Sequence, residues 1–194
     1  MFFRVAEARQ AAREFESAQY VRKSAGTLLT DSVQFSEAKK FDVFLSHSFD
    51  DAEIILGVKR LIEKRGKSVY VDWIEDKGLD RGKVTPATAA LLRNRMRSCS
   101  TFIYASSESS PSSRWMPWEL GYFDGHKPDM ISIMPLVENY DFEWKSQEYL
   151  GLYPVLERPN NSSADSTAYV VRGSRIQKLA DFGNALPTDS YKTW

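Results

Sequence analysis

The hydrophobic pattern of this chain alternates between two periods. Short apolar runs, each four to eight residues long, are typical of strands buried in a parallel sheet. Five segments have this pattern: 41–46, 68–73, 100–105, 130–137 and 153–156. Between them, apolar residues recur every three or four positions, which predicts amphipathic helices. These helical segments are 51–65, 86–96 and about 114–125.

The order strand, helix, strand along the chain predicts an α/β fold. We expect a flavodoxin-like parallel sheet of about five strands with helices on both faces. Gly66 ends the first of these helices, and Thr85 with Pro86 has the pattern of a helix start. Residues 75–84 are charged and hold two glycines, which predicts a loop, and residues 175–182 read as a last helix.

The N-terminal segment has a different character. Residues 2–23 are rich in alanine and carry one narrow apolar stripe, which predicts an N-terminal helix that packs on the domain or binds a partner. The polar residues that follow read as a linker. We therefore divide the chain into an N-terminal helix and linker (1–38), the α/β domain (39–186) and a tail (187–194).

Composition narrows the classes of function. The 194 residues carry 26 basic and 26 acidic side chains, so no overall charge attracts nucleic acid or an anionic membrane. Cys99 is the single cysteine, which excludes an intrachain disulfide and favours a reducing compartment. No apolar run approaches the roughly 20 residues that span a bilayer. We expect a cytoplasmic protein without a membrane or nucleic-acid partner.

Common cofactor and metal motifs are absent from the sequence. No Gly-x-Gly-x-x-Gly follows a predicted strand, and Gly82-Lys83 is followed by valine rather than by the Ser or Thr of a phosphate-binding loop. His47, His126 and one cysteine do not make a spaced zinc set. We therefore expect no bound cofactor and no metal, and look for chemistry at the carboxyl ends of the strands.

One carboxylate lies among aromatic residues. In a helix over residues 114–122, Trp115, Trp118, Glu119 and Tyr122 fall on one stripe. Burial there would raise the pKa of Glu119 and suit it to acid or base chemistry. On spacing alone, the favoured interpretation is that the tryptophans are core residues and that Glu119 pairs with an arginine.

Four motifs together resemble the Toll/interleukin-1 receptor (TIR) domain family. They are the opening strand with its polar turn (41–51), the second strand (69–72), the glycine-bearing loop (79–83) and the Arg-Trp-Met-Pro-Trp-Glu segment (114–119). They follow the family's order and rough spacing. The compact layout resembles the bacterial antiphage-defence (Thoeris-type) members that consume NAD.

The resemblance implies cleavage of the nicotinamide–ribose bond of NAD, with NAD as substrate rather than cofactor. It implies that Glu119 is the catalytic carboxylate, while Trp115 and Trp118 shield the site or stack on a base. Further expected substrate-binding residues are Ser46, His47, Phe49, Asp50 and Trp73 around the strand ends, and Arg81 and Lys83 for the diphosphate. Five of these residues have a structural alternative: a cap for Ser46 or Asp50, a turn role for His47, and solvated charges for Arg81 and Lys83.

The product is open at this point, either ADP-ribose or a cyclic isomer. The resemblance further implies self-association with other TIR-like chains and a separate effector protein that reads the nucleotide. Two other functions remain: a non-enzymatic TIR assembly module, and an N-deoxyribosyltransferase-like enzyme acting on nucleosides. The charges of Arg81 and Lys83 suit a diphosphate better than a nucleoside.

Overall fold

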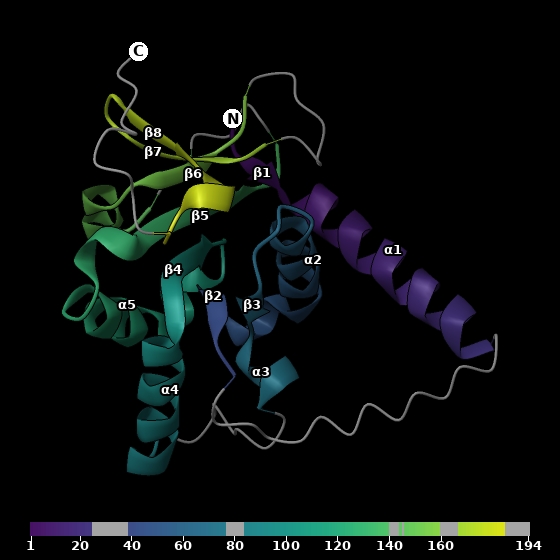
Figure 1. Cartoon of the computed structure of the whole chain (residues 1–194), viewed down its shortest axis with the longest axis horizontal. Coiled ribbons are helices and arrows are strands. Elements are labelled where there is room, and N and C mark those ends of the chain that lie inside the picture. The colour runs from purple at the N-terminus through teal and green to yellow at the C-terminus, as the bar shows by residue number, and fades with distance from the viewer. Residues whose placement is uncertain (25–38, 77–83, 140–143, 145, 160–166, 185–194) are drawn as a thin grey trace.

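The computed structural model describes residues 1–24, 39–76, 84–139, 144, 146–159 and 167–184 (Figure 1). Within these residues one sheet has the order β3-β2-β4-β5-β6-β7-β8, and β1 pairs with β5. Five successive strands of this order are β3 (Val69–Tyr70), at one edge, then β2 (Phe41–Ser46), β4 (Cys99–Ser106), β5 (Ile131–Val137) and β6 (Val155–Glu157). All neighbouring pairs among these five are parallel. The prediction of a parallel sheet of about five strands is confirmed.

Helices cover both faces of the sheet, as predicted. On one face α1 (Val5–Ser24) lies beside α2 (Ala52–Glu63), and on the other face lie α4 (Pro86–Ser98) and α5 (Met116–Asp124). Each face has its own apolar core. Alternation along β2 supplies both, since Val43 and Leu45 pack in the first core and Phe44 in the second.

The N-terminal segment is built into the sheet. Before the helix begins at Val5, β1 (Phe3–Arg4) pairs with the second half of β5 in parallel. The Arg158 guanidinium donates to the Glu7 carboxylate over 2.7 Å and to the Phe2 carbonyl over 3.2 Å. The predicted helix therefore packs on the domain. The domain boundaries stay a prediction, since residues 25–38 and 185–194 lie outside the described part.

The predicted helix signals act as expected. Gly66 follows α2 with φ 82°, the left-handed conformation that glycine adopts most easily. The Thr85 hydroxyl accepts a hydrogen bond from the Thr88 amide over 3.1 Å, with Pro86 at the first helical position. Short 3-10 turns connect other elements: Phe49–Asp51, Ser110–Ser112, Pro128–Met130, Glu148–Leu152 and Leu179–Asp181.

The second strand is shorter than predicted. Residues 68–73 read as one strand, but β3 covers only Val69–Tyr70 and a short helix, α3 (Asp72–Glu75), begins directly after it. Asp72 and Glu75 are helix-compatible acids in a first turn, where negative charge is favoured. Asp72 thus starts a helix at the carboxyl edge of the sheet.

The last predicted helix, residues 175–182, is wrong. β7 (Tyr169–Arg172) and β8 (Arg175–Lys178) form an antiparallel hairpin on β6, and only Leu179–Asp181 is helical. Gly173 has φ 58° and makes the two-residue turn with Ser174. The spacing of Ile176 and Leu179 suggested a helix, but the glycine turn and the β-branched Val170 and Val171 favour strands. None of the described helices combines the length and the apolar character that crossing a membrane requires.

Candidate active site

Glu119 and Ser46 make direct contact in the interior. The Ser46 hydroxyl donates to Glu119 Oε2 over 2.6 Å, and both residues have no exposed surface. Ser46 is the last residue of β2, and Glu119 lies in the first turn of α5. Pro117 sits in the same first turn, where it removes no helical hydrogen bond, as the sequence required. The short distance is typical of a hydrogen bond to an ionised carboxylate.

This contact lies at the point where the strand order reverses. β2 is flanked by β3 on one side and by β4 on the other, so the chain winds in opposite directions from it. In open parallel sheets, ligands bind beyond the carboxyl ends of the strands at this switch point. The glutamate is therefore held where the fold ordinarily places a ligand.

Tyr104 is a residue of this site that the sequence reasoning missed. It lies opposite Ser46 in the register of β4 with β2, and its hydroxyl donates to Gln147 Oε1 over 3.3 Å. Burial raises the pKa of Tyr104, and nearby Tyr149 and the charge of Glu119 raise it further. The phenol therefore stays protonated near neutrality and remains a hydrogen-bond donor. Tyr104 lies next to Ser46 because of the register of β4 with β2, which the sequence pattern does not reveal.

His47 contacts a different carboxylate. Its ring is buried, with Nδ1 2.9 Å from the Leu45 carbonyl oxygen and Nε2 3.4 Å from Asp72 Oδ1. If the ring is protonated, it forms an ion pair with Asp72, while Nδ1 donates to the Leu45 carbonyl. The pair joins the end of β2 to the start of α3. Its contacts are with Asp72 rather than with Glu119.

The aromatic residues of the α5 stripe pack in two different environments. Trp115 is buried, and its ring centroid lies 5.4 Å from that of half-buried Trp118. Trp118 stacks on Tyr122 with centroids 5.9 Å apart, and the Arg93 guanidinium of α4 lies 5.9 Å from its ring. Trp118 thus packs toward α4, whereas Glu119 reaches Ser46 on the sheet.

The turn after β2 has one exposed ring. Phe49 is 68% exposed, and Asp50 is exposed beside it. The next acid, Asp51, is buried and accepts hydrogen bonds from Ser107 and Ser109, each over 2.5 Å. These bonds tie the turn after β2 to the serine-rich segment after β4, a link that the sequence reasoning did not predict.

Of the three remaining predicted residues, Trp73 lies shortly after β3. Trp73 is half-buried against the first core, and its indole nitrogen is buried with no acceptor among the described residues. Arg81 and Lys83 lie outside the described residues. Asp76 is the last described residue before them in the chain. It accepts two hydrogen bonds from Arg95 of α4, over 2.9 and 2.7 Å.

Tyr70 completes this buried cluster, since its hydroxyl donates to Asp76 Oδ2 over 2.6 Å. Burial raises the pKa of Tyr70, and its bond to Asp76 raises it further. The bidentate bond to Asp76 raises the pKa of Arg95. A charged pair therefore fixes the chain at the start of the segment that carries Arg81 and Lys83.

Access to the glutamate requires movement. Because Glu119 is fully buried, a molecule from outside could contact it only if surrounding side chains were displaced. Within the described ranges, no three His, Cys, Asp or Glu side chains gather into a set that could hold a metal ion. The chemistry available at this site is therefore that of a carboxylate with hydroxyl and aromatic neighbours.

Comparison with known proteins gives two relatives. Over 124 residues, 64% of this chain and 64% of the relative, it is 55% identical to a Bacillus cereus (strain MSX-D12) protein named provisionally as the 3' cyclic ADP-D-ribose synthase ThsB'. Over 93 residues, 47% of this chain and 24% of the relative, it is 30% identical to a Cytobacillus dafuensis protein named provisionally as the cyclic ADP-D-ribose synthase TIR2. No family model matches the chain.

Each match covers less than two thirds of the relative's own length. The two relatives confirm the resemblance to Thoeris-type TIR-like proteins, and the sheet with helices on both faces is consistent with a TIR-like fold.

Proposed function

We propose that this chain, a homologue of TIR-like cyclic ADP-D-ribose synthases, cleaves the nicotinamide–ribose bond of NAD and forms a cyclic ADP-ribose isomer. The observation that carries the proposal is the buried Ser46–Glu119 contact of 2.6 Å at the switch point of the sheet. The names of both relatives supply the product class.

One carboxylate suffices for this reaction. The bond between ribose C1 and the pyridinium nitrogen breaks, and its electron pair leaves with neutral nicotinamide, so the leaving group needs no proton. Positive charge develops on the ribose, as in glycoside hydrolysis. An ionised Glu119 offsets this charge and accepts hydrogen bonds from ribose hydroxyls. Ser46 holds one carboxylate oxygen in place for that contact.

Ring closure then competes with hydrolysis. In cyclisation, either a hydroxyl oxygen of the same molecule bonds to ribose C1 and releases its proton, or a ring nitrogen bonds through its lone pair and the base releases a proton elsewhere. Attack by water gives ADP-ribose and releases one proton. The complete burial of Glu119 and the burial of Trp115, four residues before it, favour exclusion of water. The name of the Bacillus relative favours closure at the 3' position.

The remaining expected contacts belong to the same proposal. Phe49 and Trp73 stack on a base, and Arg81 and Lys83 hold the diphosphate as charge-assisted donors. Self-association with other TIR-like chains assembles the active form, and a separate effector protein reads the nucleotide.

The decisive experiment incubates the purified protein with NAD at low and high protein concentration. Liquid chromatography with mass spectrometry follows nicotinamide and the nucleotide products, since a cyclic isomer is lighter than ADP-ribose by one water. We expect equal amounts of nicotinamide and cyclic product. Glu119→Gln should lower both by about a hundredfold or more, with an unchanged melting temperature.

Glu108→Gln is the matched control, because Glu108 is an exposed acid in the serine-rich segment. It should retain full turnover. Nicotinamide release that persists in Glu119→Gln would overturn the catalytic role, and release of a free base from nucleosides but not from NAD would favour the deoxyribosyltransferase-like function.

A further inference from the structure

Two hydrogen-bonded bridges join the same pair of chain segments at the carboxyl edge of the sheet. The first is the Ser46–Glu119 contact, between the end of β2 and the start of α5. The second, the Asp51 bridge, joins Asp51 in the turn after β2 to Ser107 and Ser109 after β4. Since the chain leads from these serines through a short turn to α5, both bridges hold the start of α5 near β2.

The Asp51 bridge is built on a buried carboxylate. Asp51 is 8% exposed, and its Oδ2 accepts hydrogen bonds from the Ser107 and Ser109 hydroxyls, each over 2.5 Å. Such short distances are typical of hydroxyl groups that donate to an ionised carboxylate. The two serine oxygens lie 3.1 Å apart, so one carboxylate oxygen binds both. Loss of Asp51 would leave both hydroxyls without this acceptor, so the bridge depends on one side chain.

The serine turn connects the Asp51 bridge to α5. The Ser110 hydroxyl accepts a hydrogen bond from the Ser107 amide over 2.8 Å and donates to the Ala105 carbonyl over 3.0 Å. At the other end of the turn, the Met116 amide donates to the Ser113 hydroxyl over 3.3 Å. Hydrogen bonds therefore anchor the turn both to the end of β4 and to the first residue of α5. A displacement of the turn would move α5 as well.

The Asp51 bridge crosses the switch point of the sheet. From β2 the chain passes through α2 to β3 on one side, and from β4 it passes through α5 to β5 on the other side. The connections after β2 and β4 therefore frame the crevice in which open parallel sheets bind ligands. Because Asp51 lies in one connection and the two serines lie in the other, the bridge sets the distance between the two walls.

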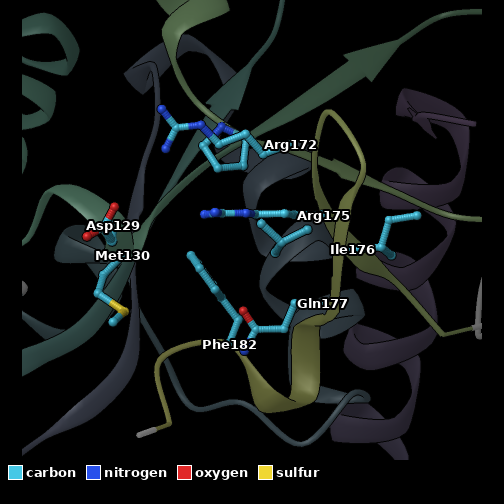
Figure 2. A pocket seen from close by; sticks show the side chains of 9 residues that line it. Asp129, Met130, Arg172, Arg175, Ile176, Gln177 and Phe182 are labelled. Carbon is cyan, nitrogen blue, oxygen red and sulfur yellow. The ribbon is translucent and has the colours of Figure 1, made fainter. Parts of the chain in front are cut away.

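A cavity of about 280 Å³ lies at the other edge of the sheet (Figure 2). It is lined by Met130 and Pro154, which directly precede β5 and β6, and by residues of the β7–β8 hairpin. Its described lining includes neither Ser46 nor Glu119. The cavity thus lies at the amino ends of the strands, whereas Asp51 lies at the carboxyl edge, on the side of the proposed chemistry.

We propose that Asp51 is a positioning residue that favours ring closure over hydrolysis at the Glu119 site. This inference rests on the NAD cleavage proposed above. While the bridge is formed, α5 is held against β2 and Glu119 stays beside Ser46. When the bridge is broken, the crevice widens and water reaches ribose C1, where it competes with the internal nucleophile. Asp51 therefore raises both the rate and the share of cyclic product without touching the substrate.

Two variants remove the bridge from opposite sides: Asp51→Ala, and the double variant Ser107→Ala with Ser109→Ala. Each should lower nicotinamide release by about tenfold and raise the ratio of ADP-ribose to cyclic product by about threefold or more, because the reacting groups lose their alignment. The triple variant should change little further, since all three changes break the same bonds. Glu108→Ala is the matched control, because Glu108 is an exposed acid between the two serines. It should keep the unaltered rate and product ratio.

A second readout needs no NAD. Met116 is buried at the start of α5, whereas Met134 on β5 lies in the other core, on the opposite face of the sheet. In chains carrying methyl-¹³C methionine, Asp51→Ala should shift the Met116 methyl signal and leave the Met134 signal in place. Leucine substitutions at the two positions assign the signals, and a melting curve shows whether each variant is folded.

The two readouts separate this inference from the proposed function. A product ratio that stays unaltered in Asp51→Ala, or a Met116 signal that does not move, would overturn the positioning role. A triple variant whose loss is the sum of the other two would also overturn it, since the side chains would then act independently. If the unaltered chain released no nicotinamide, the proposed function would fail, while the Met116 signal would still test the bridge.

Discussion

Ser46 and Glu119 lie 73 positions apart in the chain and share a hydrogen bond of 2.6 Å inside the protein. The bond joins the end of the central strand β2 to the first turn of α5. Ser46 has one hydroxyl proton, and it donates this proton in the hydrogen bond to the Glu119 carboxylate. The orientation of the proposed catalytic group therefore depends on a residue of a different element.

Ser46→Ala should lower nicotinamide release by about ten- to a hundredfold, because loss of a hydrogen bond to a charged group amounts to about 1.5–3 kcal/mol. Initial rates with NAD, measured alongside a melting curve, check this. Ser132→Ala is the control: Ser132 on β5 is equally buried, but its hydroxyl has no hydrogen-bond partner among the described residues. It should change neither rate nor stability. Equal losses in both variants would assign the effect to packing.

Much of the fold follows from local patterns. The run over Phe41–Ser46 matches β2 because its apolar side chains serve a core on each face. The predicted start of α4 agrees with the structure because the Thr85 cap and Pro86 depend only on residues close in the sequence. By contrast, the pairing of Phe3 with Leu136 depends on a two-residue strand, which is too short to produce a period.

The site was predictable only in part. Glu119 was found from its motif, but its partner depends on how α5 sits against β2, and Tyr104 depends on strand register. The prediction of a helix over residues 175–182 is wrong because Ile176, on a short strand, and Leu179, in the turn that follows, have the spacing of helical residues. Tertiary pairing with β6 decides that competition in favour of strands.

Gly57→Ala should destabilise the protein by separating α1 from α2. A Cβ at Gly57 would lie 1.7 Å from the Ala8 carbonyl oxygen, so one helix must move. We expect a loss of about 3 kcal/mol, which lowers Tm by at least about 6 °C. Gly121→Ala on α5 is the control, since its Cβ meets no atom within 4 Å, and Tm should stay or rise slightly. An unchanged Tm in Gly57→Ala would contradict this packing.

Glu7 should make stability depend on pH. Burial raises the pKa of Glu7, but the Arg4 amide and the Arg158 guanidinium outweigh it and hold the pKa below its ordinary value of 4.5. A lowered pKa in the folded state adds stability above about pH 4.5, and this stability is lost as the pH falls through the folded pKa. The difference in unfolding free energy between the unaltered chain and Glu7→Gln should therefore shrink in acid.

Urea unfolding across this pH range measures the difference. Glu16→Gln serves as a comparison, because Glu16 is an exposed acid on the same helix α1. Its difference should stay small and flat. A Glu7→Gln difference that grew in acid would show that the sign is wrong.

Tyr104→Phe tests whether the phenol beside Glu119 takes part in catalysis. Its pKa is raised by burial, by Tyr149 and by the charge of Glu119, so the hydroxyl keeps its proton well above neutral pH. The hydroxyl donates to Gln147 in this structure, so it can donate to Glu119 or to a ribose oxygen only after that bond breaks. We expect about a tenfold loss of nicotinamide release, the effect of one neutral hydrogen bond of about 1.4 kcal/mol. Between pH 6 and 9, roughly, the ratio of the two rates should stay constant, because the phenol of the unaltered chain does not titrate there.

Tyr149→Phe separates this role from a structural one. The Tyr149 hydroxyl donates to the same acceptor, Gln147 Oε1, over 2.7 Å. If the two hydroxyls act only by holding Gln147, both variants should lose activity, and Tyr149→Phe should lose more because its bond is shorter than the 3.3 Å bond from Tyr104. If Tyr104 acts on the glutamate or the substrate, only Tyr104→Phe should show the tenfold lower rate of nicotinamide release. Tyr149→Phe should then release nicotinamide at nearly the rate of the unaltered chain. The comparison thus decides whether β4 contributes a third side chain, beside Ser46 and Glu119, to the proposed chemistry.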